Sequence, residues 1–340
     1  MKAEILGAIA FSFARKTGWA LAYPKIIWLV SAIVIFFGFI YLVFFLAEKS
    51  PIKMQDKLKY VVFLVPALLF LFIGLVAPTI RTIYLSFFDA RGKNFIGIEN
   101  YLWAFTQPEI QTILKNTLIW VVATPVGSTL IGLALAVLTD KMKRSSIPKS
   151  LIFMPMAISF VGASIIWKFV YEPARLNDSQ IGLLSQIWIS LGFTPPNWLL
   201  TIPLNTFLLI IVLIWIETGF AMVVLSAAIK AIPEDVLEAS MLDGAYGWKQ
   251  FIKVTVPMIR TTLVVVLATI TIATLKVFDI VRTMTGGNFQ TSLIANEMYQ
   301  QSFRALNYGT GSALAVILFI GVLPLVAYNV RQLQREKSVR

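Results

Sequence analysis

Seven long apolar runs, separated by polar segments, constrain this sequence more than any other feature. Each run is long enough, or nearly so, to cross roughly 30 Å of hydrocarbon as a helix. With 58% hydrophobic and only 14% charged residues, the chain is too apolar for a water-soluble protein. We therefore expect an all-α, polytopic transmembrane helical bundle. The predicted spans are residues 26–47, 60–80, 116–139, 150–167, 205–229, 261–280 and 309–330.

The Lys and Arg residues between the spans predict the orientation of the bundle. One set of alternating segments holds 16 Lys and Arg in 63 residues, and the other set holds 13 in 130. By the positive-inside rule the denser set is cytoplasmic and includes the C-terminus. The net charge of +12 is thus explained by topology, and no nucleic-acid partner is expected. The dense set is 48–59, 140–149, 230–260 and 331–340; the other is 1–25, 81–115, 168–204 and 276–308.

The N-terminus conflicts with this orientation, because four basic residues lie in a segment that should be external. Ile5, Ile9 and Phe13 share one side of a helix, so residues 1–25 are predicted to form an interfacial segment. A cleaved signal peptide is the alternative. The run 26–47 is too long for the apolar region of such a peptide, which favours a retained span.

The absence of Cys and His excludes several kinds of site. Ser-His-Asp triads, thiol nucleophiles, thiolate zinc sites and His-ligated haem all require one of these residues. No Gly-x-x-x-x-Gly-Lys-Ser/Thr motif occurs, so ATP should not bind to this chain through a P-loop. No carboxylate cluster is spaced like a metal cage. We expect a chain that is not an enzyme and has no metal or cofactor of its own.

The segment 230–260 is much longer than the other inner loops and carries helix signals. Pro233 followed by two acidic residues predicts a helix start, since acids suit the positive end of the helix dipole. Gly244 predicts the end of that helix, and a second short helix is expected around 248–254. The resulting ridge would be accessible to a cytoplasmic partner.

This loop resembles the signature of permease subunits of binding-protein-dependent ABC importers. That motif is Glu-Ala-Ala, three residues, Gly, nine residues, Ile, one residue, Leu-Pro. Its matching positions here, at full spacing, are Glu238, Ala239, Ser240, Gly244, Val254, Val256 and Pro257. Ser replaces the second Ala, and Val replaces both Ile and Leu. The resemblance implies a coupling loop at 230–260 that docks on an ATP-hydrolysing subunit, with candidate coupling residues Glu238, Ala239, Ser240, Asp243, Gly244 and Pro257.

The resemblance covers about residues 58–335 and is strongest to the sugar-permease branch that includes the larger maltose-importer permease. It rests further on Asn100-Tyr101 to Asn116-Thr117, on Phe153-Met154-Pro155, and on Phe278-Asp279-Ile280 with Thr285-Gly286-Gly287. It implies a six-helix type I permease core with one extra N-terminal span. It also implies import of a sugar or oligosaccharide across a prokaryotic inner membrane, and the finer resemblance is to permeases for alpha-glucosides or similar oligosaccharides. The implied partners are a second permease subunit forming a heterodimer, two ATP-binding subunits that hold the ATP, and an extracytoplasmic sugar-binding protein.

Three charged residues fall within the predicted spans, where ionisable groups often mark transport pathways. Glu217 lies near the middle of its span, and Lys276 and Asp279 lie near the end of theirs. Glu217 could accept hydrogen bonds from sugar hydroxyls, or it could pair with Lys276 inside the bundle. Lys276 and Asp279 are three residues apart, so they would share one helical face and are expected to form an ion pair with each other. The candidate pathway residues are Trp215, Glu217, Gly219, Phe220, Met222, Lys276 and Asp279; the aromatic and small ones could equally be packing residues.

Two other functions compete with the importer subunit. A self-sufficient secondary transporter could use Glu217 and Lys276 as proton or ion groups, although the odd number of spans and the lack of a repeat disfavour it. A membrane enzyme is disfavoured by the absence of His, Cys and paired carboxylates outside the lipid.

Overall fold

The computed structural model describes residues 18–48, 64–173 and 182–337, and within these ranges the chain is almost entirely helical. The described ranges contain no strand beyond an isolated bridge between Phe88 and Phe95. The all-α prediction is confirmed. The apolar residues expected to form an interfacial helix near the N-terminus lie outside the described residues. The chain divides into two compact units, 1–80 and 81–340.

Two apolar helical segments are described between residues 18 and 85, and the second of them crosses the boundary between the two units at residue 80. Helix α2 runs from Gly18 to Glu48, so it extends to both sides of the predicted span 26–47. A second helix is described from Leu64 to Leu85, with a π-helical turn η1 (Phe72–Val76) followed by α4 (Ala77–Leu85). The rings of Phe36 and Phe70 meet edge to face with centroids 5.9 Å apart. Most of the described large apolar side chains of these segments are exposed, as expected for surfaces that meet lipid.

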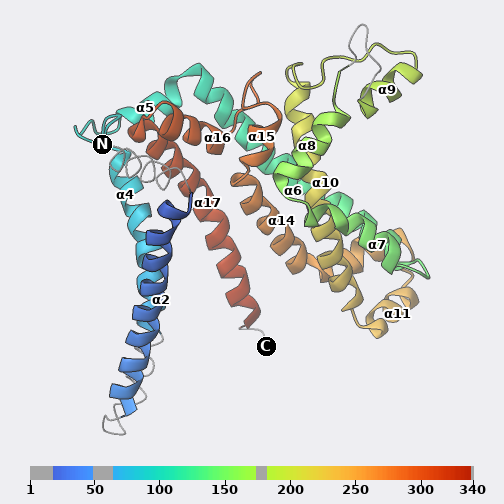
Figure 1. The fold of residues 1–340 in the computed structure, drawn as a ribbon. Helices are drawn as coiled ribbons and strands as arrows, with labels where there is room; N and C mark the ends of the chain where they lie inside the picture. The colour runs from blue at the N-terminus through green and yellow to red at the C-terminus, as the bar shows by residue number, and fades with distance from the viewer. Residues whose placement is uncertain (1–17, 49–63, 174–181, 338–340) are drawn as a thin grey trace, which may run out of the picture. The chain divides into compact units, whose positions relative to one another are not determined.

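The second unit contains the remaining helices (Figure 1). They are α5 (Glu99–Thr106), α6 (Pro108–Asp140), α7 (Ser146–Phe153), η2 (Met154–Ala157), α8 (Phe160–Val170), α9 (Leu183–Ser190), α10 (Leu204–Lys230), α11 (Glu234–Leu242), α12 (Trp248–Gln250), η3 (Phe251–Thr255), α13 (Val256–Met258), α14 (Arg260–Leu275), α15 (Asp279–Met284), α16 (Ile294–Tyr299), η4 (Gln300–Arg304) and α17 (Tyr308–Lys337).

Helices α6 and α10 form the centre of this unit and pack along each other, with α14 also against α6. A Cβ on Gly132 would lie 2.6 Å from that of Ala221, so the two backbones approach as only a glycine permits. Leu213 and Met222, both fully buried, belong to the two apolar clusters that α10 shares with its neighbours. The central position of α10 puts its middle turns inside the bundle.

Two of the predicted spans are bent or interrupted. The run 150–167 is not one straight helix, because the segments Ser146–Ala157 and Phe160–Val170 meet at 104°. Ser159 begins α8 by accepting a hydrogen bond from the backbone N–H of Gly162 at 3.1 Å. The run 261–280 ends as a helix at Leu275, and α14 meets the preceding Trp248–Met258 segment at 70°.

By length and composition, three of the described helices can cross a membrane, and up to five can if each bent pair is one span. The three are Leu64–Leu85, Pro108–Asp140 and Leu204–Lys230. Ile27–Leu42 and Tyr308–Pro324 are shorter apolar helical stretches. The chain therefore combines continuous helical spans with broken ones, and broken spans are tolerated where neighbouring helices cover the exposed backbone groups.

Candidate functional site

The loop after α10 contains a short helix whose two ends are fixed by local chemistry. Helix α11 begins directly after Pro233, with Glu234 and Asp235 in its first turn. At the other end the N–H of Ala245 donates to the carbonyl of Ser240 at 2.9 Å, and the N–H of Gly244 donates to that of Met241 at 3.0 Å. These two bonds form a Schellman motif, which needs a left-handed residue after the helix cap.

Gly244 supplies that conformation, with φ +76° and no other atom within 4 Å of where a Cβ would lie. Glycine is thus favoured at this motif position by the left-handed backbone conformation. It is not required to avoid a clash with other atoms of this chain. Glycine adopts positive φ without steric cost, whereas other L-residues are strained there. The motif residue therefore sets the direction in which the chain leaves α11.

The second half of the loop is tied to α11 by side chains that sequence reasoning did not single out. The Gln250 amide donates to the Leu237 carbonyl at 2.9 Å and to the Ser240 hydroxyl at 2.8 Å. Lys249 donates to the carbonyl of Gly244 at 3.0 Å. Ser240 is buried, so the Ser that replaces the motif's second Ala gains a hydrogen-bonding role. The two halves of the loop are held together as one structural element.

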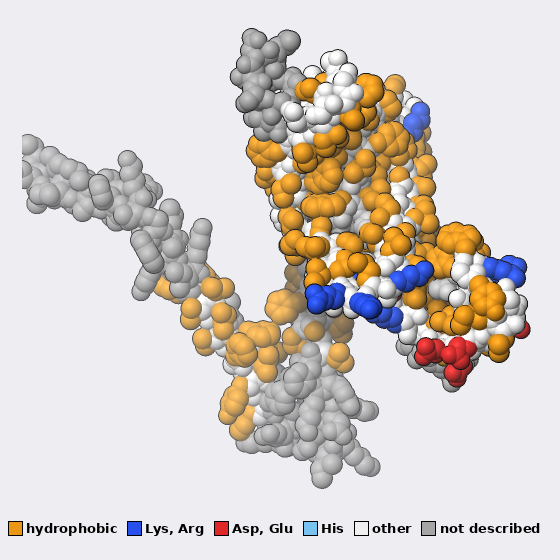
Figure 2. Space-filling model, turned by 90° about the vertical axis from the view of Figure 1, so that its right-hand side faces the viewer, with side chains coloured by type: hydrophobic (Ala, Val, Ile, Leu, Met, Phe, Trp, Pro, Cys, Tyr) orange, Lys and Arg blue, Asp and Glu red, His pale blue; other side chains and the backbone are white. Residues whose placement is uncertain are grey.

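The outer face of the loop presents charged and apolar side chains to the surroundings. Of the motif positions, Glu238, Ala239, Gly244 and Pro257 are exposed, as is the predicted coupling residue Asp243. Leu242 is 89% exposed and Trp248 is 73% exposed, and such large apolar groups are typical of a surface that a partner covers. Figure 2 shows an acidic patch on the lobe that projects from the helical bundle, where α11 lies, with basic side chains on nearby surface.

A polar cluster joins three helices at the base of this loop. The Asp140 carboxylate forms an ion pair with Lys149, and Lys230 lies 3.4 Å from it. The hydroxyl of Ser226 donates to Asp140 at 2.9 Å and accepts from Lys149 at 2.7 Å. Sequence reasoning missed this cluster, although one acid in an otherwise basic inner segment was a usable signal. The cluster fixes the inner ends of α6, α7 and α10 next to the coupling loop.

The predicted pathway residues of α10 lie in different surroundings. Trp215 meets Trp167 edge to face at 5.6 Å, and both line a largely apolar cavity of about 470 Å³. A Cβ on Gly219 would lie 2.7 Å from the carbonyl oxygen of Ile152, so this glycine permits close packing of α10 on α7. Met222 is fully buried in the core, and Phe220 packs against the same apolar cluster.

Glu217 lies near the middle of α10 and is half-buried. Its carboxylate neither accepts a hydrogen bond from nor pairs with any residue in the described part of the chain. The Glu217–Lys276 pair considered above is therefore not formed. A half-buried, unpaired carboxylate in a central helix is available to a ligand, because its hydrogen-bonding capacity is not used internally.

The prediction that Lys276 and Asp279 pair on one helical face is wrong. Helix α14 ends at Leu275, Lys276 caps it, and Asp279 begins α15 after a break. Across residues 18–48, 64–173 and 182–337, neither side chain forms an ion pair. Lys276 is exposed and Asp279 is half-buried, so both charges remain free in the described structure.

Comparison with known proteins identifies the family. Residues 110–337, well over half of the chain, match the family described as binding-protein-dependent transport system inner membrane component. The chain belongs to this family. It is therefore a permease component of an inner membrane transport system, and the resemblance recognised in the coupling loop is confirmed.

Two relatives are similar over most of their length. The osmoprotective compounds uptake permease protein GgtC of Synechocystis sp. is 50% identical over 82% of this chain and 100% of its own. The alpha-glucoside transport system permease protein AglF of Rhizobium meliloti is 45% identical over 84% of this chain and 86% of its own.

A crystal structure of a bacterial ABC transporter that imports alginate is similar in fold. It has a TM-score of 0.72 at 20% identity, and the match covers 83% of this chain and 97% of that one. A second structure of the alginate transporter, in complex with an alginate-bound periplasmic protein, matches equally well. This similarity supports the assignment of the helical bundle to the importer permease fold.

Proposed function

We propose that this protein is the membrane-spanning subunit of an ATP-binding-cassette importer that moves a sugar or oligosaccharide across a prokaryotic inner membrane. The observation that carries the proposal is the coupling loop, in which an exposed α11 and the left-handed Gly244 occur at the motif spacing of such permeases. Family membership supports it, as does the alpha-glucoside transport named for a relative that is 45% identical.

ATP would be bound and hydrolysed by partner chains, because the sequence has no P-loop motif. We propose two copies of an ATP-binding subunit, a second permease that pairs with this one, and an extracytoplasmic binding protein. Closing of the ATP-bound partners would move α11 and shift the bundle between two states. The bonds between α11 and Gln250, and the cluster around Asp140, would transmit this movement to α6, α7 and α10.

Glu217 is proposed as an acceptor for sugar hydroxyls within the bundle. Its carboxylate has no partner in the described structure, and Trp215, two positions before it, lines a cavity beside α10. A carboxylate with an aromatic ring nearby can bind a neutral sugar through hydrogen bonds and stacking. Lys276 and Asp279 remain proposed pathway residues as separate charges rather than as a pair.

The self-sufficient secondary transporter is less well supported, since the family is dependent on a binding protein. The test is purification of the intact assembly from native cells in mild detergent. We expect a second permease and a P-loop ATPase to purify with this chain, and ATP-dependent uptake of an alpha-glucoside after reconstitution with the binding protein. Uptake by this chain alone, without ATP, would contradict the proposal.

A further inference from the structure

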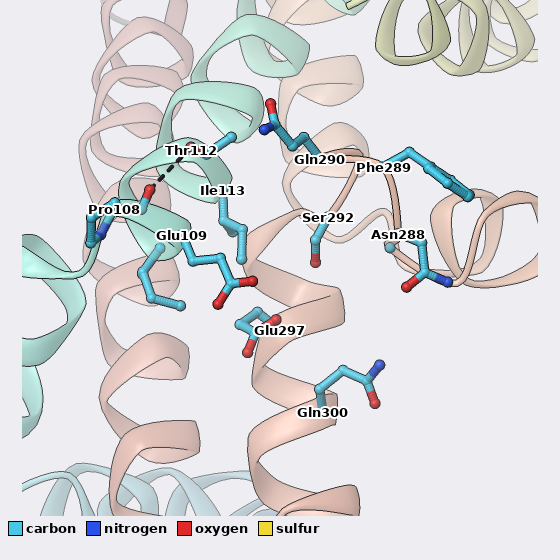
Figure 3. A pocket seen from close by; sticks show the side chains of 12 residues that line it. Pro108, Glu109, Thr112, Ile113, Asn288, Phe289, Gln290, Ser292, Glu297 and Gln300 are labelled. Atoms are coloured by element: carbon cyan, nitrogen blue, oxygen red, sulfur yellow. Dashed lines mark hydrogen bonds between the residues drawn. The ribbon is translucent and has the colours of Figure 1, made fainter. Parts of the chain in front are cut away.

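A pocket of about 620 Å³, lined by both polar and apolar residues, opens between the first turn of α6 and the segment that leads into α16 and η4 (Figure 3). Both segments belong to loops that are predicted to be external. None of the coupling or pathway residues discussed above lines it. We call it the outer pocket; the residues used below are Glu109, Asn288, Phe289, Gln290, Glu297 and Gln300.

The outer pocket contains several polar groups without a partner in the described chain. Glu109 and the side-chain amides of Gln290 and Gln300 make no hydrogen bond with any residue that the structure describes. Glu297 accepts one hydrogen bond, from Gln301 at 2.8 Å. Figure 3 shows the carboxyl groups of Glu109 and Glu297 on the same side of the pocket. The pocket thus offers free acceptors from carboxylates, and both donors and acceptors from amides.

One wall of the pocket is held in a strained conformation. Phe289 and Gln290 have φ values of 53° and 58°, a region that costs non-glycine residues of order 1–3 kcal/mol each. Hydrogen bonds from both central helices hold the turn in this strained conformation. Asn205 of α10 donates to the Phe289 carbonyl at 2.8 Å, and Asn116 of α6 donates to the Gln290 carbonyl. The turn is therefore preorganised and is not a free loop, which lowers the entropy lost when a ligand binds.

The chemistry of the lining selects the class of ligand. No Lys or Arg lines the pocket, and two carboxylates do, so an anion would be repelled. Among the described residues no group of three or more acidic side chains could hold a metal ion. The lining is about equally polar and apolar, so a ligand with both hydroxyl groups and C–H surface suits it better than a purely apolar one. A neutral polyhydroxyl compound matches these groups, because its hydroxyls can both donate to the carboxylates and exchange hydrogen bonds with the amides.

We propose that the outer pocket is a carbohydrate-binding subsite, distinct from the site around Glu217, that holds one or two rings of a neutral saccharide before it enters the bundle. The volume lies within the range of small-molecule pockets, about 300–1,000 Å³. This inference rests on the proposed function for the identity of the substrate class. A loop of the binding protein is the alternative occupant, and the experiment separates the two.

The test uses the complete transporter in lipid nanodiscs without its binding protein. Saturation-transfer NMR with maltose and trehalose measures direct sugar binding. We expect weak binding to the wild type and about a tenfold loss of affinity in Glu109→Gln and in Gln300→Ala, because each substitution removes hydrogen bonds to the sugar. Glu99→Gln is the matched control, since Glu99 is also an exposed acid in the first turn of a helix but does not line the pocket.

Glu217→Ala separates the two proposed sugar sites. Retained binding in this variant supports an independent outer subsite. The inference would be overturned if Glu217→Ala abolished sugar binding while Glu109→Gln left it unchanged. The whole signal would then come from the site within the spans. No sugar binding by a wild-type assembly that still carries out ATP-dependent sugar uptake would also overturn the inference while leaving the proposed function intact. If, in that case, Glu109→Gln weakens retention of the binding protein, the pocket is a protein contact instead.

Discussion

Substitution of Gly244 tests whether the coupling loop depends on backbone conformation or on the size of a side chain. Gly244 has φ +76°, and a Cβ there would meet no atom of this chain within 4 Å. An alanine would therefore not clash internally but would hold a strained conformation at a cost of about 1–2 kcal/mol. That cost corresponds to a factor of about 5–30 between the native turn and an unwound one.

The side chains should therefore rank by their tolerance of the left-handed region. Asn adopts this region more readily than Ala, and β-branched Val is the least suited. We expect ATP-dependent uptake in proteoliposomes to fall in the order Gly244, Gly244→Asn, Gly244→Ala, Gly244→Val, with little transport left in the last. Retention of the ATPase subunit during purification should follow the same order, because the Schellman bonds at the end of α11 weaken.

Gly192→Ala is the matched control, since Gly192 has φ +81° and equally open space but follows α9, far along the chain from the loop. It should reduce thermal stability by a similar amount and leave retention of the ATPase subunit unchanged. Normal uptake by Gly244→Val would refute the coupling assignment. Loss of function in Gly244→Asn as complete as in Gly244→Val would refute the backbone argument and indicate that the partner packs directly on the glycine.

Substitutions at three further residues test other parts of the structure. Asp140→Asn should lower the free energy of unfolding by about 1–3 kcal/mol, because Lys149 loses its partly buried ion-pair partner, and thermal unfolding in detergent measures this. Glu217→Gln and Glu217→Ala should both raise the sugar concentration that gives half-maximal uptake; unchanged affinity in both would exclude a sugar contact. The backbone N–H of Lys93 donates to the Asp89 carboxylate and lowers the pKa of that carboxyl below its usual value. The ionised Asp89 therefore stabilises the folded state at pH values above the pKa that Asp89 has in the unfolded chain. This stabilisation should be lost as the pH falls through the lowered pKa that Asp89 has in the folded state. In Asp89→Asn the stability should therefore fall less steeply at acid pH, and a curve of thermal stability against pH measures this.

The sequence by itself determined the features that depend on neighbouring residues. Apolar run length was enough to predict a helical membrane protein, because only a helix satisfies its own backbone groups in lipid. Pro233, the acids that follow it and Gly244 predicted the ends of α11, since capping acts within a few residues of the chain. The motif spacing, read without any structure, identified the family.

The tertiary structure decided what depends on residues far apart in the chain. The break after Leu275, which separates Lys276 from Asp279, occurs with no proline or glycine near it to mark the site. Asp140 and Ser226 are 86 residues apart, and Asn116 lies 174 residues before the carbonyl that it supports. No periodicity in the sequence encodes such pairs. The packing of α6 on α10 brings Asp140 and Ser226 together, and the fold also places the turn that contains Gln290 against Asn116 of α6. An unpaired polar group in that interior would cost free energy.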